Sequence, residues 1–322
     1  MSDLGETLDI TNDNVQDEKL SNFRFEVNEF RKDTFLTQNK LAERADVTAS
    51  LLSQVLGGRY RGNRDEVINK VLAYIRKEKS NLQKKIKSIP FVETSIFEKI
   101  CDILNIADID KKIVVLTGDT GIGKSFALRE YCKQTPSAIL ISVDDTYRYD
   151  TPIRDIAEKL KLDTRGNIDR VMKRVVEALK ETGRMLIIDE AERLPLKGLS
   201  ILRSLHDKTG IPIAIVGLQK LYDDIIVRND MRQVYSRMQW AKLDKLSKKD
   251  VSDIIQTVFD NVSSDVLDTF FDISKGYAVY VTSLIRMTQR IMLNKNCELL
   301  SQAVITASGS LFTEHLKHSY KK

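Results

Sequence analysis

The chain has 322 residues, of which 42% are hydrophobic and 30% charged, a composition that supports two or three folded domains and excludes a fibrous or wholly disordered protein. No apolar run approaches the roughly 20 residues of a membrane helix, and the N-terminus lacks the order of a signal peptide, so we expect a cytoplasmic protein with no membrane partner. The net charge of +5 permits a nucleic-acid partner, and three scattered cysteines show no metal-ligand spacing.

The N-terminal part of the chain is expected to hold a small helical domain after an acidic tail. Residues 1–20 carry few large apolar side chains, which predicts a disordered tail. Residues 21–76 have helical apolar spacing, and within them two short helices are expected on either side of a turn near Ala45. With Thr48 capping the second helix, this pattern predicts a helix-turn-helix domain.

The second of these helices presents short polar side chains, and a glycine-flanked basic loop follows it, as expected for contacts with a DNA groove and its phosphates. The predicted DNA-binding residues are Thr48, Ser50, Ser53, Arg59 and Arg61. A helical bundle that contacts proteins fits the same pattern. The charged segment 77–90 ends in a proline and is interpreted as a mobile linker, whose lysines either face solvent or touch DNA.

The most specific motif follows an apolar run at 113–116 that predicts a buried strand, and it precedes a helix expected at 126–133. Backbone N–H groups close on phosphate oxygens only where side chains are absent, Lys124 reaches the β- and γ-phosphates, and the Ser125 hydroxyl holds Mg²⁺. The predicted ATP-binding residues are Gly118, Asp119, Thr120, Gly121, Ile122, Gly123, Lys124, Ser125 and Phe126. A glycine-rich turn without a ligand is the alternative.

Strands and helices then alternate over residues 91–246, which predicts an α/β domain with a parallel sheet. Strands are expected at 138–143, 185–188 and 211–216, and crossover helices at 155–160 and 169–182. From residue 247 to residue 322 the apolar spacing is purely helical and predicts a C-terminal helical lid. Its helices are expected at 250–259, 265–271, 278–293 and 298–316.

The strand at 185–188 ends in Asp189 and Glu190, a pattern typical of ATPases. Asp189 is predicted to hold Mg²⁺ through water, and Glu190 to orient and deprotonate the attacking water. A strand that ends in an ordinary charged turn is the alternative. Just past the strand at 211–216, Gln219 is placed to report the γ-phosphate, unless it is only a surface turn residue.

Three arginines follow in a stretch where one of them can reach the γ-phosphate of a neighbouring subunit. They are Arg228, Arg232 and Arg237. Arg237, just before an apparent last strand, is the predicted one, and ordinary salt bridges account for the others.

In their order, these motifs resemble those of the AAA+ ATPases, and within that class those of the phage Mu B transposition family. The likeness runs from about residue 36 to residue 286. It is carried by residues 91–94 at the domain entry, 127–131 in the first helix, 187–191 in the acidic strand, and the loop of Tyr60, Gly62 and Asn63. The resemblance implies a homo-oligomer that assembles with ATP on double-stranded DNA, with little sequence preference, and that recruits a transposase.

The resemblance also implies site residues. Members of the family place residues after the second strand against DNA, which here are Tyr147, Arg148 and Tyr149, although an exposed loop is the alternative. Two positions depart from the pattern: Tyr280 stands where many members have a γ-phosphate arginine in the lid, and Leu218 stands where they have a polar residue. A helix-turn-helix operator reader or replication initiator stays open as a second function, and a signalling ATPase as a third.

Overall fold

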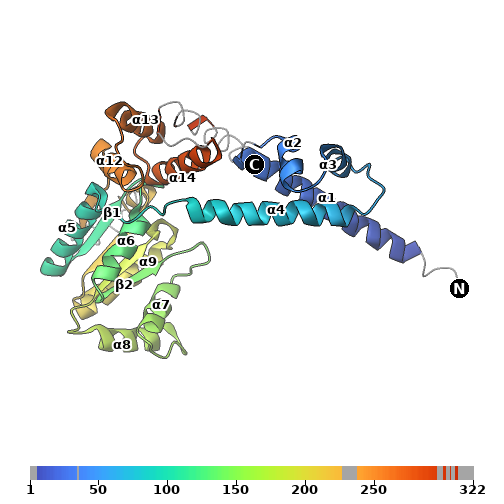
Figure 1. Cartoon of the computed structure of the whole chain (residues 1–322). Helices are drawn as coiled ribbons and strands as arrows, with labels where there is room; N and C mark the ends of the chain where they lie inside the picture. Colours follow the sequence, from blue (N-terminus) through green and yellow to red (C-terminus); the bar gives the residue numbers. More distant parts are fainter. Residues whose placement is uncertain are drawn as a thin grey trace. The chain divides into compact units, whose positions relative to one another are not determined.

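The computed structural model describes residues 6–34, 36–226, 238–295, 300–301, 305 and 309–310 of the chain (Figure 1). The chain divides into two units, which are described separately. The helical unit comprises residues 1–89, 258–266 and 283–322, and the sheet unit comprises residues 90–257 and 267–282. Among the helices that the structure describes, none is long and apolar enough to cross a membrane.

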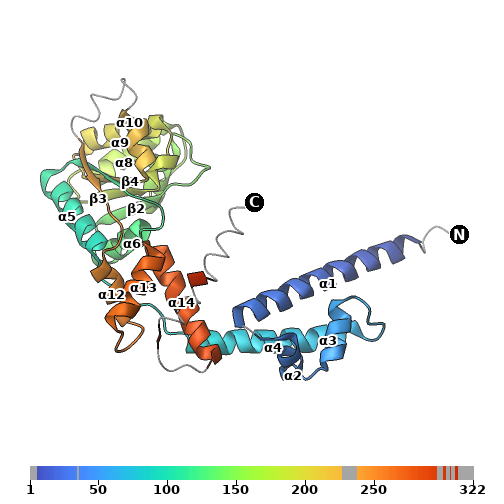
Figure 2. The ribbon, with the colours of Figure 1, turned by 90° about the horizontal axis from the view of Figure 1, so that it is seen from above.

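The helical unit begins with four helices. They are α1 (Glu6–Thr34), α2 (Gln38–Arg44), α3 (Ala49–Leu56) and α4 (Arg64–Lys85). Phe23, Val27 and Phe30 recur at spacings of four and three, so they share one face of α1 and are all buried. This face packs against α3 and α4, and Figure 2 shows α2 and α3 beside α4.

The two short helices and the turn near Ala45 are confirmed. Thr48 lies before α3, and its hydroxyl oxygen accepts a hydrogen bond from the Leu51 N–H at 3.2 Å, which satisfies one of the free donors of the first turn. Leu41 of α2 and Leu52 of α3 are fully buried and belong to the same hydrophobic core. The polar side chains of α3 are therefore left at the surface.

The structure corrects two expectations for this unit. Helix α1 begins at Glu6, so the chain is helical within the predicted disordered tail, and α4 runs to Lys85, so most of the predicted linker 77–90 is helix. Extending a helix from a packed nucleus costs little, because each added residue contributes a hydrogen bond. The ion pair of Lys79 with Glu26 of α1, at 2.9 Å, also holds this part of α4.

The sheet unit contains five parallel strands in the order β2-β3-β4-β1-β5. Their bounds are β1 (Ile113–Thr117), β2 (Ala138–Ser142), β3 (Met185–Asp189), β4 (Ile213–Gly217) and β5 (Gln239–Lys242). The three central strands β3, β4 and β1 are buried along their whole length, as expected where helices cover both faces of a parallel sheet. The predicted parallel α/β fold is confirmed.

Helix α5 (Ser95–Asp110) precedes β1, and further helices follow the strands along the chain. They are α6 (Lys124–Gln134), α7 (Thr151–Lys159), α8 (Ile168–Leu179), the 3-10 turn η1 (Ala191–Arg193), α9 (Leu196–Thr209) and α10 (Gln219–Ile226). Helices α5, α9 and α10 were not predicted, although Leu199, Leu202 and Leu205 of α9 recur every three residues and are buried. Since β4 lies between β1 and β3, the carboxyl ends of these three strands adjoin at one edge of the sheet.

The lid begins with α12 (Lys248–Gln256), α13 (Ser264–Ser274) and α14 (Ala278–Lys295), which confirms three predicted helices. The fourth, at 298–316, lies largely outside the described residues. Ser247 and Asp250 form a capping box at the start of α12, and the Asp250 carboxylate also accepts hydrogen bonds from the Ser95 N–H at 2.7 Å and the Ser95 hydroxyl at 2.6 Å. Asp250 thus ties the first lid helix to α5.

Replacing Asp250 with alanine is expected to lower the free energy of unfolding by about 1–3 kcal/mol, because the Ser95 and Ser247 donors lose their acceptor. Burial alone would raise the pKa of Asp250, but these hydrogen bonds outweigh it and hold the pKa below its usual range. The stabilisation is therefore present above about pH 3.9, the pKa of an unfolded aspartate, and is lost as the pH falls through the folded-state pKa. Urea denaturation of both proteins across this range measures it, and equal midpoints at neutral pH would contradict it.

Candidate functional site

The candidate site lies at the edge of the sheet unit where β1, β3 and β4 end. The Gly118 N–H, at the end of β1, donates to the Gly217 oxygen of β4 at 3.2 Å, so the loop after β1 starts beside the end of β4. Crevices at the carboxyl ends of parallel strands are where α/β proteins bind their ligands. The loop of residues 118–123 leads from here into α6.

Glycines shape this loop for different reasons. Gly121 and Gly123 have φ angles of 79° and 104°, in the region that favours glycine. A Cβ atom on Gly121 would lie 2.7 Å from Cγ1 of Val279, and one on Gly118 would lie 2.7 Å from Cδ1 of the buried Ile122, so neither position has room for a side chain. Gly123 is also the N-cap of α6, whose first N–H groups have no partner within the helix.

Lys124 closes this loop from inside. Its ammonium donates to the Gly118 oxygen at 2.8 Å and to the Asp119 oxygen at 2.9 Å, and only 8% of the residue is exposed. Burial lowers the pKa of Lys124, and the charges of Glu192 and Asp189 oppose that effect. An enclosed cation at the positive end of an eleven-residue helix, beside a loop that contains three glycines, fits a phosphate group.

The remaining predicted loop residues surround this centre. Asp119 and Thr120 are exposed, and Ser125 is half-buried in the first turn of α6. Phe126 is 48% exposed, and its ring centroid lies 5.9 Å from that of Phe91.

Asp189 and Ser125 supply oxygens that suit Mg²⁺. Asp189 is the last residue of β3 and is buried, and its Oδ1 accepts from the Glu190 N–H at 2.9 Å. Its charge raises the pKa of Lys124, which places the carboxylate within electrostatic range of the loop. The residues present therefore fit a nucleotide with its metal ion.

Glu190 is held in an unusual backbone conformation and in an ion pair. Its φ of 56° lies in the left-handed region, and its Oε2 lies 3.2 Å from Nη2 of Arg193. Arg193 also reaches Asp145, in the loop after β2, with Nη1 3.6 Å from its Oδ2. The carboxylate that the sequence assigns to water activation is thus engaged by a cation of its own turn.

Gln219 lies where the sequence places it, at the start of α10 just past β4. Its Oε1 accepts a hydrogen bond from the Thr117 hydroxyl at 3.5 Å, so its side chain stands beside the end of β1 and the phosphate loop. The preceding residue, Leu218, donates its N–H to Oε2 of Glu192 at 3.1 Å. Sequence reasoning missed Glu192, for which the only signal was a third acidic residue two places after Glu190.

The start of the lid helix α14 meets the phosphate loop directly. The Val279 N–H donates to the Gly121 oxygen at 3.0 Å, and the Tyr277 hydroxyl donates to the Asp119 carboxylate at 3.4 Å. Lys245 lies over the Tyr277 ring, with its ammonium 4.2 Å from the ring centroid. Tyr277 and Val279 of the lid therefore contact the loop, at positions that the sequence pattern did not indicate.

Arg228, Arg232 and Arg237 lie outside the described residues. A cation from a neighbouring subunit therefore stays a prediction.

The three residues predicted to contact DNA in the loop after β2 differ in their exposure. Tyr147 is half-buried against the core of the sheet unit and its hydroxyl donates to the Asp155 carboxylate, and burial together with that carboxylate raises its pKa. Part of its ring therefore packs against the core, and its contact with DNA stays a prediction. Arg148 and Tyr149 are exposed, and Lys197 lies 4.5 Å from the centroid of the Tyr149 ring.

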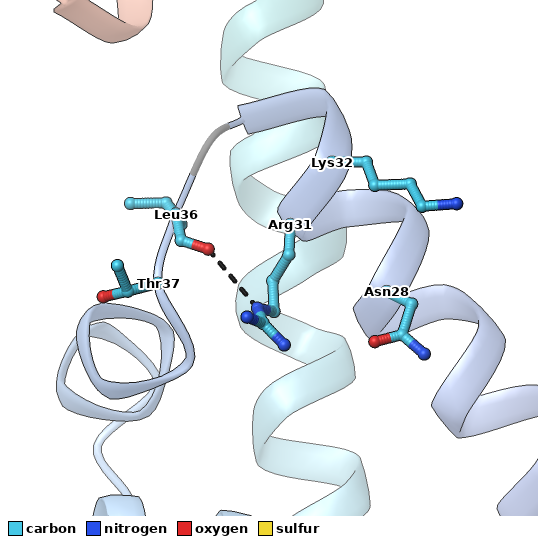
Figure 3. A pocket seen from close by; sticks show the side chains of 5 residues that line it. All are labelled: Asn28, Arg31, Lys32, Leu36 and Thr37. Carbon is cyan, nitrogen blue, oxygen red and sulfur yellow. Dashed lines mark hydrogen bonds between the residues drawn. The ribbon is translucent and has the colours of Figure 1, made fainter. Parts of the chain in front are cut away.

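In the helical unit, the residues predicted to contact DNA are all exposed: Thr48, Ser50, Ser53, Arg59 and Arg61. A pocket of about 500 Å³ also lies between the end of α1 and the start of α2, lined by Asn28, Arg31, Lys32, Leu36 and Thr37 (Figure 3). The Arg31 side chain crosses this pocket and donates from Nε to the Leu36 oxygen at 3.4 Å. The lining is therefore rich in cationic and hydrogen-bonding groups.

Comparison with known proteins finds a domain family and related transposition proteins. A family profile described as an AAA domain matches residues 108–224. The Mu-like prophage FluMu DNA transposition protein B of Haemophilus influenzae is 29% identical over 218 residues, which cover 66% of this chain and 75% of that protein. The ATP-dependent target DNA activator B of Escherichia phage Mu is 24% identical over 228 residues, covering 68% of this chain and 72% of that protein.

Solved structures share the fold. The ORC1 protein of Aeropyrum pernix in complex with DNA matches with a TM-score of 0.51 and 16% identity, over 69% of this chain and 66% of that chain. The ORC2 protein of the same organism matches with a TM-score of 0.52 and 16% identity, over 70% of this chain and 69% of that chain. At this identity the likeness shows a common fold alone.

Proposed function

We propose that this protein is an ATPase that uses ATP and Mg²⁺ to assemble on DNA. The chain carries a nucleotide-binding AAA domain and is related to the Mu B transposition proteins, which supports this proposal. Its substrate is ATP, which it hydrolyses slowly to ADP and phosphate. The observation that carries the proposal is the enclosed ammonium of Lys124 beside the carboxylates that end β3.

Each residue of the site has a task in this reaction. Lys124 and the N–H groups of the loop bind the phosphates, and Ser125 and Asp189 hold Mg²⁺, which supplies positive charge to the phosphate oxygens when bound. Glu190 leaves its ion pair with Arg193, orients the attacking water and accepts its proton. Gln219 stands beside the terminal phosphate, and we assign the cation that completes the site to Arg237 of a neighbouring copy.

We further propose that the chain binds double-stranded DNA with little sequence preference, assembles there as a homo-oligomer, and recruits a transposase. The name of the phage Mu relative, ATP-dependent target DNA activator B, supports this proposal. The exposed polar face of α3 and the basic loop after it provide a surface for the duplex. Arg148 and Tyr149 are a second candidate surface, on the sheet unit.

Electron microscopy of the chain with random-sequence duplex DNA tests this function. We expect continuous protein-coated DNA with ATP, and bare DNA with ADP or without nucleotide. Equal coating in all three states would contradict ATP-controlled assembly. A helix-turn-helix operator reader, the second candidate, would instead keep a large preference for one sequence as the salt concentration rises.

The pocket at the end of α1 leads to a separate prediction about DNA. The first helix of a helix-turn-helix crosses the DNA backbone. Arg31 and Lys32 lie in the last turn of α1 and line the pocket just before that helix, α2. Each phosphate contact that is lost removes about 0.9 from the slope of log K against log salt concentration. We therefore expect Arg31→Ala to weaken DNA binding and to reduce this slope by about one.

Fluorescence anisotropy of a labelled duplex at several salt concentrations measures the slope. Lys133→Ala is the control for charge, because this lysine of α6 is exposed and its loss changes the net charge equally. A slope that is the same in the wild type and in Arg31→Ala would exclude a phosphate contact at this pocket.

A further inference from the structure

Glu192 lies in η1, two residues after Glu190, and no step of the reaction above uses it. Its Oε2 accepts a hydrogen bond from the N–H of Leu218 at 3.1 Å. Leu218 is the first residue after β4, and β4 is the neighbour of β3 in the sheet. One carboxylate therefore ties together the ends of two adjacent strands at the edge that forms the nucleotide site.

The end of β4 is shaped to receive this carboxylate. A Cβ atom on Gly217 would lie 2.6 Å from Oε2 of Glu192 and 3.3 Å from its backbone nitrogen. Real side chains do not approach so closely, so a residue larger than glycine at position 217 would displace the carboxylate. The Glu192 carboxylate therefore occupies the space that a side chain at position 217 would need, and it packs closely against β4.

The residue that Glu192 holds is next to Gln219. Leu218 leads into α10, which packs against both η1 and β1. Gln219 is the first residue of α10, and its side chain meets the Thr117 hydroxyl at the end of β1. The hydrogen bond from Leu218 to Glu192 therefore fixes the backbone from which the Gln219 side chain projects toward the phosphate loop.

We propose that Glu192 is a positioning residue of the nucleotide site, which holds the turn after β4 so that Gln219 meets the terminal phosphate of ATP. The proposal rests on the ATPase function proposed above and deepens it. The charge of Glu192 also raises the pKa of Lys124. The positioning of the turn depends instead on the acceptor oxygen of Glu192, not on its charge. The two contributions can be separated by substitution.

Glu192→Ala removes the acceptor and the charge, whereas Glu192→Gln removes the charge and keeps an acceptor oxygen for the Leu218 N–H. A hydrogen bond to a charged group contributes enough to change a rate by about tenfold or more, so we expect kcat of Glu192→Ala to fall at least about tenfold. We expect Glu192→Gln to stay within about threefold of the wild type, because the turn remains held. Equal losses in both variants would overturn the proposal, because charge would then be the cause.

Nucleotide affinity provides a readout that does not depend on turnover. Gln219 is proposed to meet only the terminal phosphate, so Glu192→Ala should bind ADP with unchanged affinity while its affinity for a non-hydrolysable ATP analogue falls. Unchanged ADP binding also shows that the variant is folded. A variant that loses affinity for both nucleotides equally, or that hydrolyses ATP at the wild-type rate, would overturn the proposal.

A double-mutant cycle tests whether Glu192 acts through Gln219. If it does, the double variant Glu192→Ala/Gln219→Ala should be no slower than Gln219→Ala alone, and losses that multiply would refute the assignment. Glu177→Ala, at an exposed glutamate of α8, is the control. The comparison among variants tests the role of Glu192, whereas the wild-type rate tests the proposed ATPase function. A wild-type protein that does not hydrolyse ATP would overturn both the ATPase function and the role of Glu192.

Discussion

Replacing Lys124 with alanine is expected to lower the affinity for ATP at least about 30-fold and to abolish coating of duplex DNA, because truncating one partner of a buried charge pair costs about 2–5 kcal/mol. The ammonium already lies inside the loop, bonded to the oxygens of Gly118 and Asp119, so no rearrangement of the helix is needed for it to meet a phosphate. Its loss leaves a cavity at the place where the negative charge of the nucleotide gathers.

Titration with a fluorescent ATP analogue and electron microscopy of DNA measure the two effects. Lys133→Ala, on the exposed face of the same helix, controls for the change in net charge. ATP-dependent coating of DNA by Lys124→Ala at the wild-type protein concentration would contradict the proposed site.

Glu190→Gln is expected to separate binding from hydrolysis. The amide keeps the size of the side chain but cannot accept the proton of the attacking water, so kcat should fall by a factor of about 10²–10⁴. ATP should still bind, because Lys124 and the glycine loop are intact. We propose that hydrolysis releases the protein from DNA, so complexes of this variant should persist after free ATP is removed, whereas those of the wild type should dissociate.

Phosphate release and the lifetime of DNA complexes after a chase with ADP measure these effects. Glu177→Gln, the same change at an exposed position of α8, is the control. If Glu190→Gln hydrolyses ATP at the wild-type rate, another group is the base. Glu192, which lies close enough to raise the pKa of Lys124, would then be the first to examine.

The sequence predicted the parts of the site whose chemistry depends on local spacing. The loop of 118–125 and the acidic end of β3 were predicted because each is a short run attached to one strand. The buried strands were equally clear, because five residues of continuous apolar character in a parallel sheet leave a strong signal.

The rest depends on contacts between residues far apart in the chain, which spacing does not encode. The bond of Glu192 to Leu218 spans 26 residues, and the bond of Tyr277 to Asp119 spans 158. For the same reason, the sequence pattern did not reveal that the partly buried ring of Tyr147 packs against the core of the sheet unit. The acidic composition of residues 6–20 suggested disorder, but a packed helix tends to extend, and α1 begins at Glu6.

The main-chain bond between Val279 and Gly121 has a consequence for how the lid responds to ligand. A side-chain sensor, such as an arginine, can be lost by a single substitution, but an N–H group is present in every residue except proline. Any movement of the glycine loop as it closes around phosphates must therefore pull on or release the first turn of α14. This main-chain link between the loop and the lid requires no positive charge at Tyr280.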